Sequence, residues 1–229
     1  MREYGKQNHT KEKNKLYEEQ ESYRAEEDQL HDPAAQYAYR RQGEYTVDDY
    51  YALPDEQRVE LIDGVIYDMA APGFGHQTVA LHITKQLDEF IDSRGDSCLP
   101  FMSPVDVQLD CDERTMVQPD VVVLCDTNKL KKRCIYGAPD LVMEVLSPST
   151  KRKDETTKLE KYRKAGVREY WMIDFRQERV VVYDFEHKSH PAIYGMNQSI
   201  PVQIFQGDCQ IRFEKILEKV HKLQTYGAS

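Results

Sequence analysis

Two apolar segments of the sequence each carry an acidic residue of a type that could do chemistry. Asp120 leads into the apolar run 121–124, and Glu144 lies inside the apolar run 141–146. A carboxylate in such surroundings is costly to bury unless it is paired, protonated or bound to a metal ion. The alternative, a strand end half in water, is weaker for Glu144 because apolar residues flank it on both sides. The pattern therefore favours a metal-binding or catalytic role over a simple salt bridge.

Basic residues are concentrated in the part of the chain that surrounds Glu144. Residues 129–168 hold twelve Lys or Arg and five Asp or Glu, a local charge of +7, although the whole chain has a formal net charge of −9. The acidic total excludes a protein that coats nucleic acid by bulk positive charge, but it allows a local basic site. Cations at the start of a helix oppose its dipole, which favours a phosphate beside them, although an exposed charge cluster is commoner. The predicted nucleic-acid contacts are Lys129, Lys131, Lys132, Arg133, Lys151, Arg152 and Lys153.

A third candidate group follows Glu144 on a predicted helix. Thr150 is the expected N-cap and Gly166 the expected C-terminal residue of this helix. Asp154, Lys158 and Tyr162 are spaced at four-residue intervals, so they share one stripe of it. Taken alone, an Asp–Lys pair at this spacing is a weak surface interaction.

The elements that must position these residues alternate between helix and strand. An Asp63-Gly64 turn between two short apolar runs predicts a hairpin over residues 59–67. A periodic apolar face predicts a helix over 76–93. Further helices are expected from Thr46 to about Pro54 and over 213–223. Strands are expected at 97–101, 105–109, 117–125, 141–146, 168–175 and 179–185, with one or two more before the last helix. This order predicts an α/β (α+β) domain with a central sheet covered by helices.

The first part of the chain differs in composition from the rest. Residues 1–43 are mostly charged or polar, so we expect a disordered or loosely helical polar extension, followed by one domain over 44–229. The five cysteines include no C-x-x-C pair, which excludes a zinc ribbon and favours reduced thiols in a cytoplasmic protein. No apolar run approaches the roughly 18 residues of a membrane span, and no secretory signal is readable.

Several motifs, taken in order over residues 44–217, resemble the Uma-two family of restriction endonucleases. The most specific is the string Glu-Val-Leu-Ser-Pro-Ser-Thr at 144–150. The others are 45–50, 60–64, His76 after a Pro-Gly loop, Pro119-Asp120, Asp154, Lys158, Tyr162, Gly166-Val167 and Tyr170-Trp171. The family is assigned to the PD-(D/E)XK nuclease superfamily. The resemblance implies a restriction-endonuclease-like mixed central sheet flanked by helices, and Mg²⁺-dependent (or Mn²⁺-dependent) cleavage of phosphodiesters.

The resemblance also implies roles for individual residues. Asp120 matches the Asp of the superfamily motif and Glu144 its second acid. Leu146 stands where the superfamily has its lysine, and the matching lysine in this chain is Lys158, which we expect to reach the Glu144 carboxylate. Glu60 matches an upstream acid that often completes the metal site. The implied catalytic residues are Asp120, Glu144 and Lys158, the implied metal ligands are Glu60, Asp120 and Glu144, and His76, Asp154 and Tyr162 are supporting positions without an assigned role.

The expected function is metal-dependent cleavage of DNA in the cytoplasm, with no membrane partner. One alternative is a catalytically silent module on the same fold that binds nucleic acid or protein. The presence of Asp120, Glu144 and Lys158 together argues against it. A second alternative, hydrolysis of another substrate by the carboxylate pair, leaves the basic segment unexplained. A homodimer is compatible with the sequence, which does not specify the oligomeric state.

Overall fold

The computed structural model describes residues 40–54, 57–109, 111–148 and 151–226. Most of the predicted extension over 1–43 lies outside the described residues, and so does the predicted N-cap Thr150. Within them, no helix is both long enough and apolar enough to cross a bilayer. The first elements are α3 (Val47–Ala52), capped by Thr46, and the hairpin β1 (Val59–Ile62) and β2 (Val65–Asp68). Both follow the sequence prediction.

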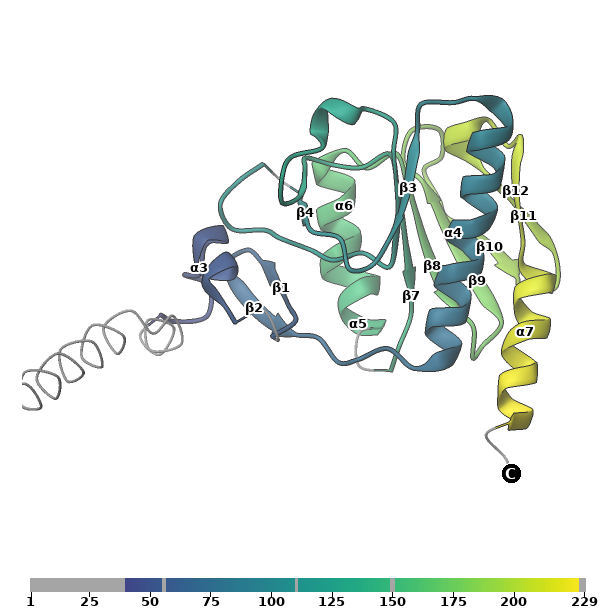
Figure 1. Ribbon diagram of the computed structural model, residues 1–229, viewed down its shortest axis with the longest axis horizontal. Helices are drawn as coiled ribbons and strands as arrows, with labels where there is room; N and C mark the ends of the chain where they lie inside the picture. Colours follow the sequence, from purple (N-terminus) through teal and green to yellow (C-terminus); the bar gives the residue numbers. More distant parts are fainter. Residues whose placement is uncertain (1–39, 55–56, 110, 149–150, 227–229) are drawn as a thin grey trace, which may run out of the picture.

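The centre of the domain is a six-stranded sheet in the order β10-β9-β8-β7-β5-β3 (Figure 1). Only β7 and β8 are parallel, and the other neighbouring strands are antiparallel, which makes the sheet mixed. Its strands are β3 (Leu99–Met102), β5 (Val121–Leu124), β7 (Leu141–Val145), β8 (Glu169–Asp174), β9 (Arg179–Asp184) and β10 (Ala192–Gly195). Short two-stranded pairs lie outside it: β4 (Val107–Gln108) with β6 (Ile135–Tyr136), and β11 (Ser199–Val202) with β12 (Cys209–Arg212).

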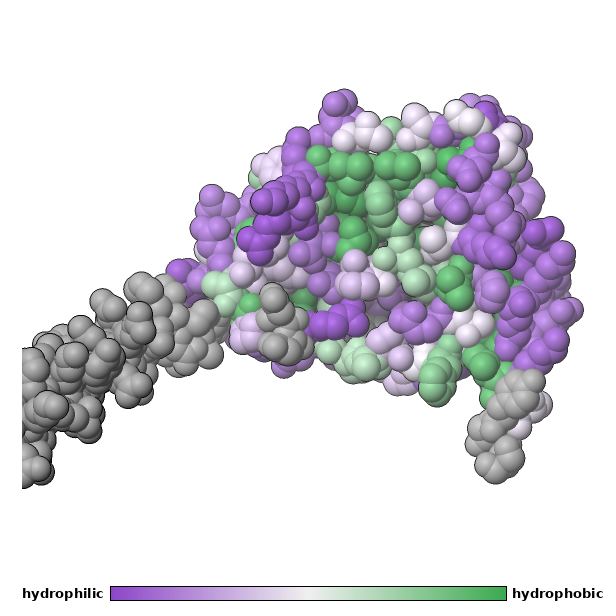
Figure 2. Space-filling view, in the orientation of Figure 1, coloured by the Kyte–Doolittle hydropathy of each residue, from purple (hydrophilic) through white to green (hydrophobic). Residues whose placement is uncertain are grey.

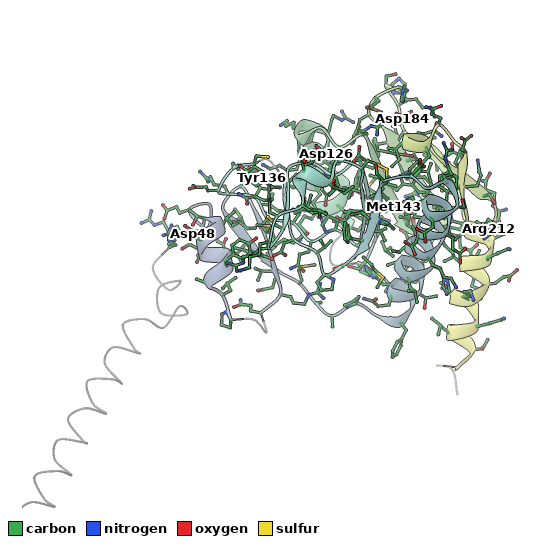
Figure 3. All side chains as sticks on the ribbon, turned by 45° about the horizontal axis from the view of Figure 1, so that its top comes forward. Asp48, Asp126, Tyr136, Met143, Asp184 and Arg212 are labelled. Carbon is green, nitrogen blue, oxygen red and sulfur yellow. A yellow bond between two sulfur atoms is a disulfide. The ribbon has the colours of Figure 1, made fainter. Side chains whose placement is uncertain are left out.

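Helices cover both faces of the sheet, as the α/β prediction required. The helices α4 (Phe74–Arg94) and α7 (Phe213–Tyr226) lie on one side, and α6 (Leu159–Ala165) lies on the other (Figure 1). Successive residues of β5 alternate between the two cores: Val121 and Val123 belong to the core of α4 and α7, whereas Val122 and Leu124 belong to the core of α6. Side chains fill the space between these layers (Figure 3).

The helix that follows β7 is not regular. It runs as α5 (Lys151–Lys153), a π-helical turn η2 (Asp154–Lys158) and then α6, and Gly166 ends it with a left-handed φ of 92°. In a π turn, the backbone hydrogen bonds span one residue more than in an α-helix, so the turn contains an additional residue. The sequence did not predict it.

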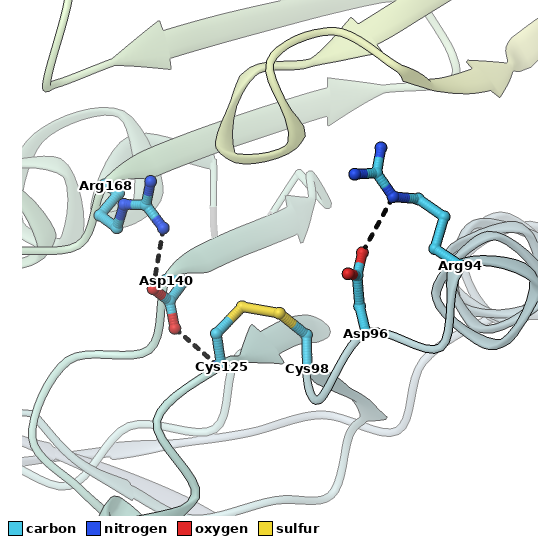
Figure 4. The surroundings of a disulfide bond; sticks show 6 residues. All are labelled: Arg94, Asp96, Cys98, Cys125, Asp140 and Arg168. Atoms are coloured by element: carbon cyan, nitrogen blue, oxygen red, sulfur yellow. Dashed lines mark hydrogen bonds and ion pairs between the residues drawn. A yellow bond between two sulfur atoms is a disulfide. The ribbon is translucent and has the colours of Figure 1, made fainter.

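The expectation that all five cysteines are reduced is wrong for two of them. Cys98 and Cys125 form a disulfide, whereas Cys111, Cys134 and Cys209 are free. Cys98 directly precedes β3 and Cys125 directly follows β5, so the antiparallel register that pairs Leu99 with Leu124 places them opposite each other (Figure 4). Because the two residues are 27 positions apart in the sequence, no local spacing pattern could reveal the pair.

Candidate active site

A cleft of about 490 Å³ lies at the edge of the sheet where β7 ends and β5 begins. The antiparallel pairing of β5 with β7 brings Asp120, just before β5, next to the end of β7, where Glu144 lies. Six of the charged residues that line the cleft come from β1, from the start of β5, from the end of β7 and from the helix after β7: Glu60, Asp120, Glu144, Lys153, Asp154 and Lys158. The fold therefore assembles the predicted carboxylates and Lys158 around one space.

Glu144 is held by two side chains from the helix that follows β7. Its side chain accepts a hydrogen bond from the Tyr162 hydroxyl at 2.7 Å. It also forms an ion pair with Lys158 Nζ, at a distance of 2.5 Å. Burial raises the pKa of Glu144 to about 8, against the Lys158 charge, and the carboxylates of Asp154, Asp120 and Glu60 add to the rise. Burial therefore makes the charged form of Glu144 less stable than it is in water, even beside Lys158.

Lys158 lies between two glutamates in the interior of the protein. Its ammonium, on a residue that is only 3% exposed, contacts Glu60 Oε1 at 2.8 Å as well as Glu144. Burial alone would lower the pKa of Lys158, but Glu144 and Glu60 together raise it well above its ordinary value. The predicted contact of Lys158 with Glu144 is therefore present, and the surface-pair alternative for Lys158 and Asp154 is wrong because both residues are buried.

The π turn contributes to this arrangement because Asp154 and Lys158 are its first and last residues. Both are buried, and so is Tyr162 in the following α-helical turn. The predicted stripe of Asp154, Lys158 and Tyr162 thus faces the interior, although the helix between them departs from α-helical geometry. π turns recur at functional sites of proteins.

Glu60 differs from the other acids of the cleft because lysines occupy both of its oxygens. Oε1 contacts Lys158, and Oε2 accepts from Lys153 Nζ at 2.8 Å. Burial would raise the pKa of Glu60, but the ammonium groups of Lys158 and Lys153 lower it to about 2. Since a metal ion would have to displace these lysines, the geometry gives no support to Glu60 as a metal ligand, and that role stays a prediction.

Asp120 is anchored by the strand next to it and by His76 of α4. Its Oδ2 accepts the Val145 backbone N–H at 2.8 Å and lies 3.1 Å from His76 Nε2. The other ring nitrogen, His76 Nδ1, is buried and has no hydrogen-bond partner in the described part of the chain. His76 therefore contacts a predicted metal ligand from the first turn of α4, which the sequence had left without a role.

Two acids of the cleft are candidate ligands for a divalent metal ion. Asp120 and Glu144 line the same cleft, and the raised pKa of Glu144 indicates that added positive charge would stabilise its ionised form. Among the described residues, no group of three or more His, Cys, Asp or Glu is arranged to hold a metal ion. Mg²⁺ suits a site with few carboxylates because it keeps several of its water molecules.

The predicted basic clusters separate in the structure. Lys153 lines the cleft, Lys151 pairs with Asp174 at 2.9 Å, and Arg152 is exposed nearby. The cluster at 129–133 begins in η1 (Thr127–Lys129), beyond the end of β5, and does not line the cleft. Because β5 and β7 are antiparallel, the end of β5 lies at the edge of the sheet opposite the cleft, at the top of Figure 1. Nucleic-acid binding by either cluster stays a prediction.

Two arginines that line the cleft were missed in the sequence. Within the described residues, Arg58 donates to neutral Ser103 and Gln118 and forms no ion pair, and its buried Nε has no hydrogen-bond partner. Arg176 is exposed at the turn after β8. Neither arginine belongs to a basic run, so local charge counting could not find them.

A mixed sheet flanked by helices, with acids and a buried lysine where β5 begins and β7 ends, defines a nuclease-like class of protein. Residues 47–214 match the family model described as "Uma2: Putative restriction endonuclease", and the chain belongs to this family. The predicted resemblance is thereby confirmed.

Two individual proteins are similar to the chain. A crystal structure described as "a putative nuclease belonging to DUF820", from Anabaena variabilis, matches with a TM-score of 0.63 and 19% identity over 76% of this chain and 98% of that one, which shows a shared fold. An "Uncharacterized protein slr1290" from Synechocystis sp. is 30% identical over 117 residues, or 50% of this chain and 60% of that protein. The chain thus matches less than two thirds of this curated relative.

Proposed function

We propose that the protein is a metal-dependent endonuclease that hydrolyses phosphodiester bonds of DNA. The observation that carries the proposal is the contact between Lys158 and Glu144 in the cleft that Asp120 also lines. A nuclease needs oxygen ligands for a hard cation and a cation beside the reacting phosphate, and the cleft supplies both. Membership of the Uma2 family supports this reaction class.

The metal would be held by Asp120 and Glu144. When bound, Mg²⁺ or Mn²⁺ supplies polarisation of the phosphodiester and a lower pKa for a water molecule. The Val145 N–H and His76 fix the orientation of Asp120, and Tyr162 fixes that of Glu144. With both carboxylates oriented by these bonds, little rearrangement is needed at the moment of reaction.

Lys158 would act on the reacting phosphate itself. Its ammonium is fixed by Glu60 and Glu144, so it is a preorganised positive charge at the floor of the cleft. In this role it stabilises the negative charge that develops on the phosphate oxygens in the transition state. Arg58 and Lys153, which also line the cleft, would bind the flanking phosphates without reading sequence.

The test is a cleavage assay on the full chain with plasmid and single-stranded DNA, in Mg²⁺, in Mn²⁺ and in EDTA. We expect cleavage in either metal and none in EDTA, and loss of cleavage in Asp120→Asn. Glu160→Gln is a matched control, because Glu160 is an exposed acid on the same helix as Tyr162. No cleavage by the wild-type chain under any of these conditions would contradict the proposal.

One observation favours a second candidate, a binding module without catalysis. Lys153 and Lys158 already balance Glu60 and Glu144 in a buried network, which such a module could retain for stability alone. DNA binding by the wild-type chain without cleavage in either metal would support this candidate.

A location in the cytoplasm and a homodimer both stay predictions. The Cys98–Cys125 disulfide weighs against a location in the reducing cytoplasm. Counting the free thiols in protein isolated under alkylating conditions tests the location. Light scattering on the purified chain tests the dimer.

A further inference from the structure

Phe74 is a large apolar side chain that the fold leaves in water beside the cleft. It is 86% exposed, the highest value among the described large hydrophobic residues that are exposed. It is the first residue of α4, two positions before His76, and it lines the same cleft as Asp120 and Glu144. Single exposed apolar residues are common on proteins, but an aromatic ring at the rim of a charged cleft is placed to meet a ligand.

The next residue shows how the start of α4 is held. A Cβ on Gly75 would lie 2.9 Å from Cε2 of the Phe175 ring, so this ring packs closely over the glycine and would have to shift for a larger residue. Phe175 in turn packs against the core of α4 and α7. The backbone beside Phe74 is therefore packed against the core, and the exposed Phe74 ring projects from it.

The lining of the cleft is divided between charged and apolar residues. The charged groups of the floor come from β1, the start of β5, the end of β7 and the π turn. Most of the apolar lining comes from the segment that joins β2 to α4, from the first residue of α4 and from the end of α7: Met69, Ala70, Ala71, Pro72, Phe74, Val220 and Leu223. Val145, Leu146 and Phe175 complete it. Figure 2 shows apolar and polar residues next to each other along the lower edge, where this segment runs into α4.

A nucleotide has the same division, with a charged phosphodiester on one side and a flat apolar base on the other. The cleft volume of about 490 Å³ falls within the range of sites that enclose small organic ligands. Arg58, which lines the cleft and forms no ion pair among the described residues, offers positive charge to a phosphate. In an intact duplex the bases are stacked inside, so Phe74 could stack only on an unpaired base.

We propose that the cleft binds single-stranded DNA, with one unpaired base stacked on the ring of Phe74 while an adjacent phosphate lies over Asp120 and Glu144. This inference rests on the proposed function and gives it a substrate class, namely unpaired DNA rather than an intact duplex. Stacking is tolerant of sequence because every base has a flat face, so Phe74 sets structure preference and not base preference.

The test measures binding of the full chain to a fluorescently labelled 12-mer single strand and to the matching duplex by anisotropy. Ca²⁺ serves as the cation, and gels check that the DNA stays intact. We expect tighter binding of the single strand, and binding about tenfold weaker in Phe74→Ala. Phe74→Trp should bind as tightly as wild type, because it keeps a flat aromatic face. Ile193→Ala is the matched control, since Ile193 on β10 is 66% exposed and does not line the cleft.

A second readout reports stacking itself. In a strand that carries 2-aminopurine, wild type should quench the fluorescence of this base and Phe74→Ala should not. Equal single-strand affinity of Phe74→Ala and wild type, equal affinity of Phe74→Leu and Phe74→Trp, or no single-strand binding by wild type would each overturn the proposal. Binding that depends on Phe74 without any cleavage in Mg²⁺ or Mn²⁺ would refute only the proposed nuclease reaction.

Discussion

Glu144 and Glu169 are two buried glutamates on neighbouring parallel strands, and only Glu144 lines the cleft. Burial raises the pKa of both carboxyls, to about 8 for Glu144 and to about 7 for Glu169. Glu169, at the start of β8, accepts hydrogen bonds from the Trp171 indole and from two backbone N–H groups at 203 and 204. Glu144, near the end of β7, instead shares a lysine with Glu60.

The difference teaches that burial and a raised pKa do not by themselves mark a functional site. Neutral N–H donors occupy both oxygens of Glu169, so its environment is complete without a ligand. Around Glu144, the nearby carboxylates of Asp154, Asp120 and Glu60 raise its pKa, so an additional cation would lower the energy. The chemistry of the neighbours separates a structural acid from a candidate metal ligand.

The largest expected effect is on the two glutamates themselves. Glu144→Gln should lower the cleavage rate by on the order of 10³-fold, because it removes a negative charge that holds the metal. Glu169→Gln should cut DNA at close to the wild-type rate, but it should lower the free energy of unfolding by about 1–3 kcal/mol because an amide cannot satisfy every N–H donor. Cleavage assays and urea unfolding measure the two effects. Similar losses of cleavage in both variants would remove the distinction between these acids.

A second prediction separates the chemical role of Lys158 from its structural role. Lys158→Met should abolish cleavage and lower the free energy of unfolding by about 3–5 kcal/mol, because it leaves two buried glutamates without their cation. In Glu60→Gln with Lys158→Met, part of the stability should return while cleavage stays lost.

The matched control for Lys158 is Lys161 on the same helix. Lys161 Nζ lies 2.5 Å from Asp63 Oδ1, away from the Glu144 carboxylate, so Lys161→Met should keep most of the activity. If Glu60→Gln with Lys158→Met recovered cleavage together with stability, Lys158 would be a structural residue only.

The third prediction concerns pH and the metal. Because the pKa of Glu144 is raised to about 8, the folded protein binds a proton there that the unfolded chain has released above its ordinary pKa of 4.5. The stability of the metal-free protein should therefore fall as pH rises from about 5 to 8, and the slope should be smaller in Glu144→Gln. The raised pKa of Glu169 also makes the stability fall with rising pH, up to about pH 7. The change of slope in Glu169→Gln therefore measures the contribution of Glu169.

Bound Mg²⁺ should offset the fall in stability that comes from Glu144, but not the fall that comes from Glu169. Mg²⁺ binding requires the ionised carboxylate, so the rise in Tm on adding Mg²⁺ should grow as pH approaches 8. Glu169→Gln should show the same growth, and Glu144→Gln should not. Differential scanning calorimetry at several pH values measures it. A rise in Tm that is equal at pH 5 and pH 8 would count against Glu144 as a metal ligand.

The smallest expected effect on cleavage comes from the disulfide at the opposite edge of the sheet. Cys125 follows the end of β5, whereas Asp120 precedes its start. Replacing both cysteines, in Cys98→Ala with Cys125→Ala, should cost about 3 kcal/mol of stability because the bond closes a loop of 27 residues. Cleavage at a temperature well below Tm should be unchanged. A large loss of activity in the folded variant would show that the two edges are coupled.

The sequence predicted the main helices and strands, because apolar periodicity and turn residues are local signals. The hairpin around Asp63-Gly64 and the start of α3 at Thr46 are examples. The sequence also singled out Asp120 and Glu144, because each is an acid beside or within an apolar run. Lys158 was found through family resemblance, since its spacing alone indicated a surface pair.

Features that depend on contacts between distant segments could not be read from the chain. The Cys98–Cys125 disulfide depends on strand register, and the pairing of Glu60 with two lysines depends on how the hairpin packs against the π turn. The separation of the two basic clusters depends on strand direction. Glu169 was not recognised as a buried acid, because Arg168 beside it gives the segment a polar appearance.

The π turn has a consequence for comparing relatives of this chain. One extra residue within Asp154–Lys158 is equivalent to an insertion in a regular helix, where each residue turns the chain by about 100°. A relative without that residue would present a different position to Glu144, so its lysine would be displaced by one in an ungapped alignment. Counting forward from the glutamate would then select the wrong residue, and a relative that keeps the lysine could be mistaken for one that has lost it.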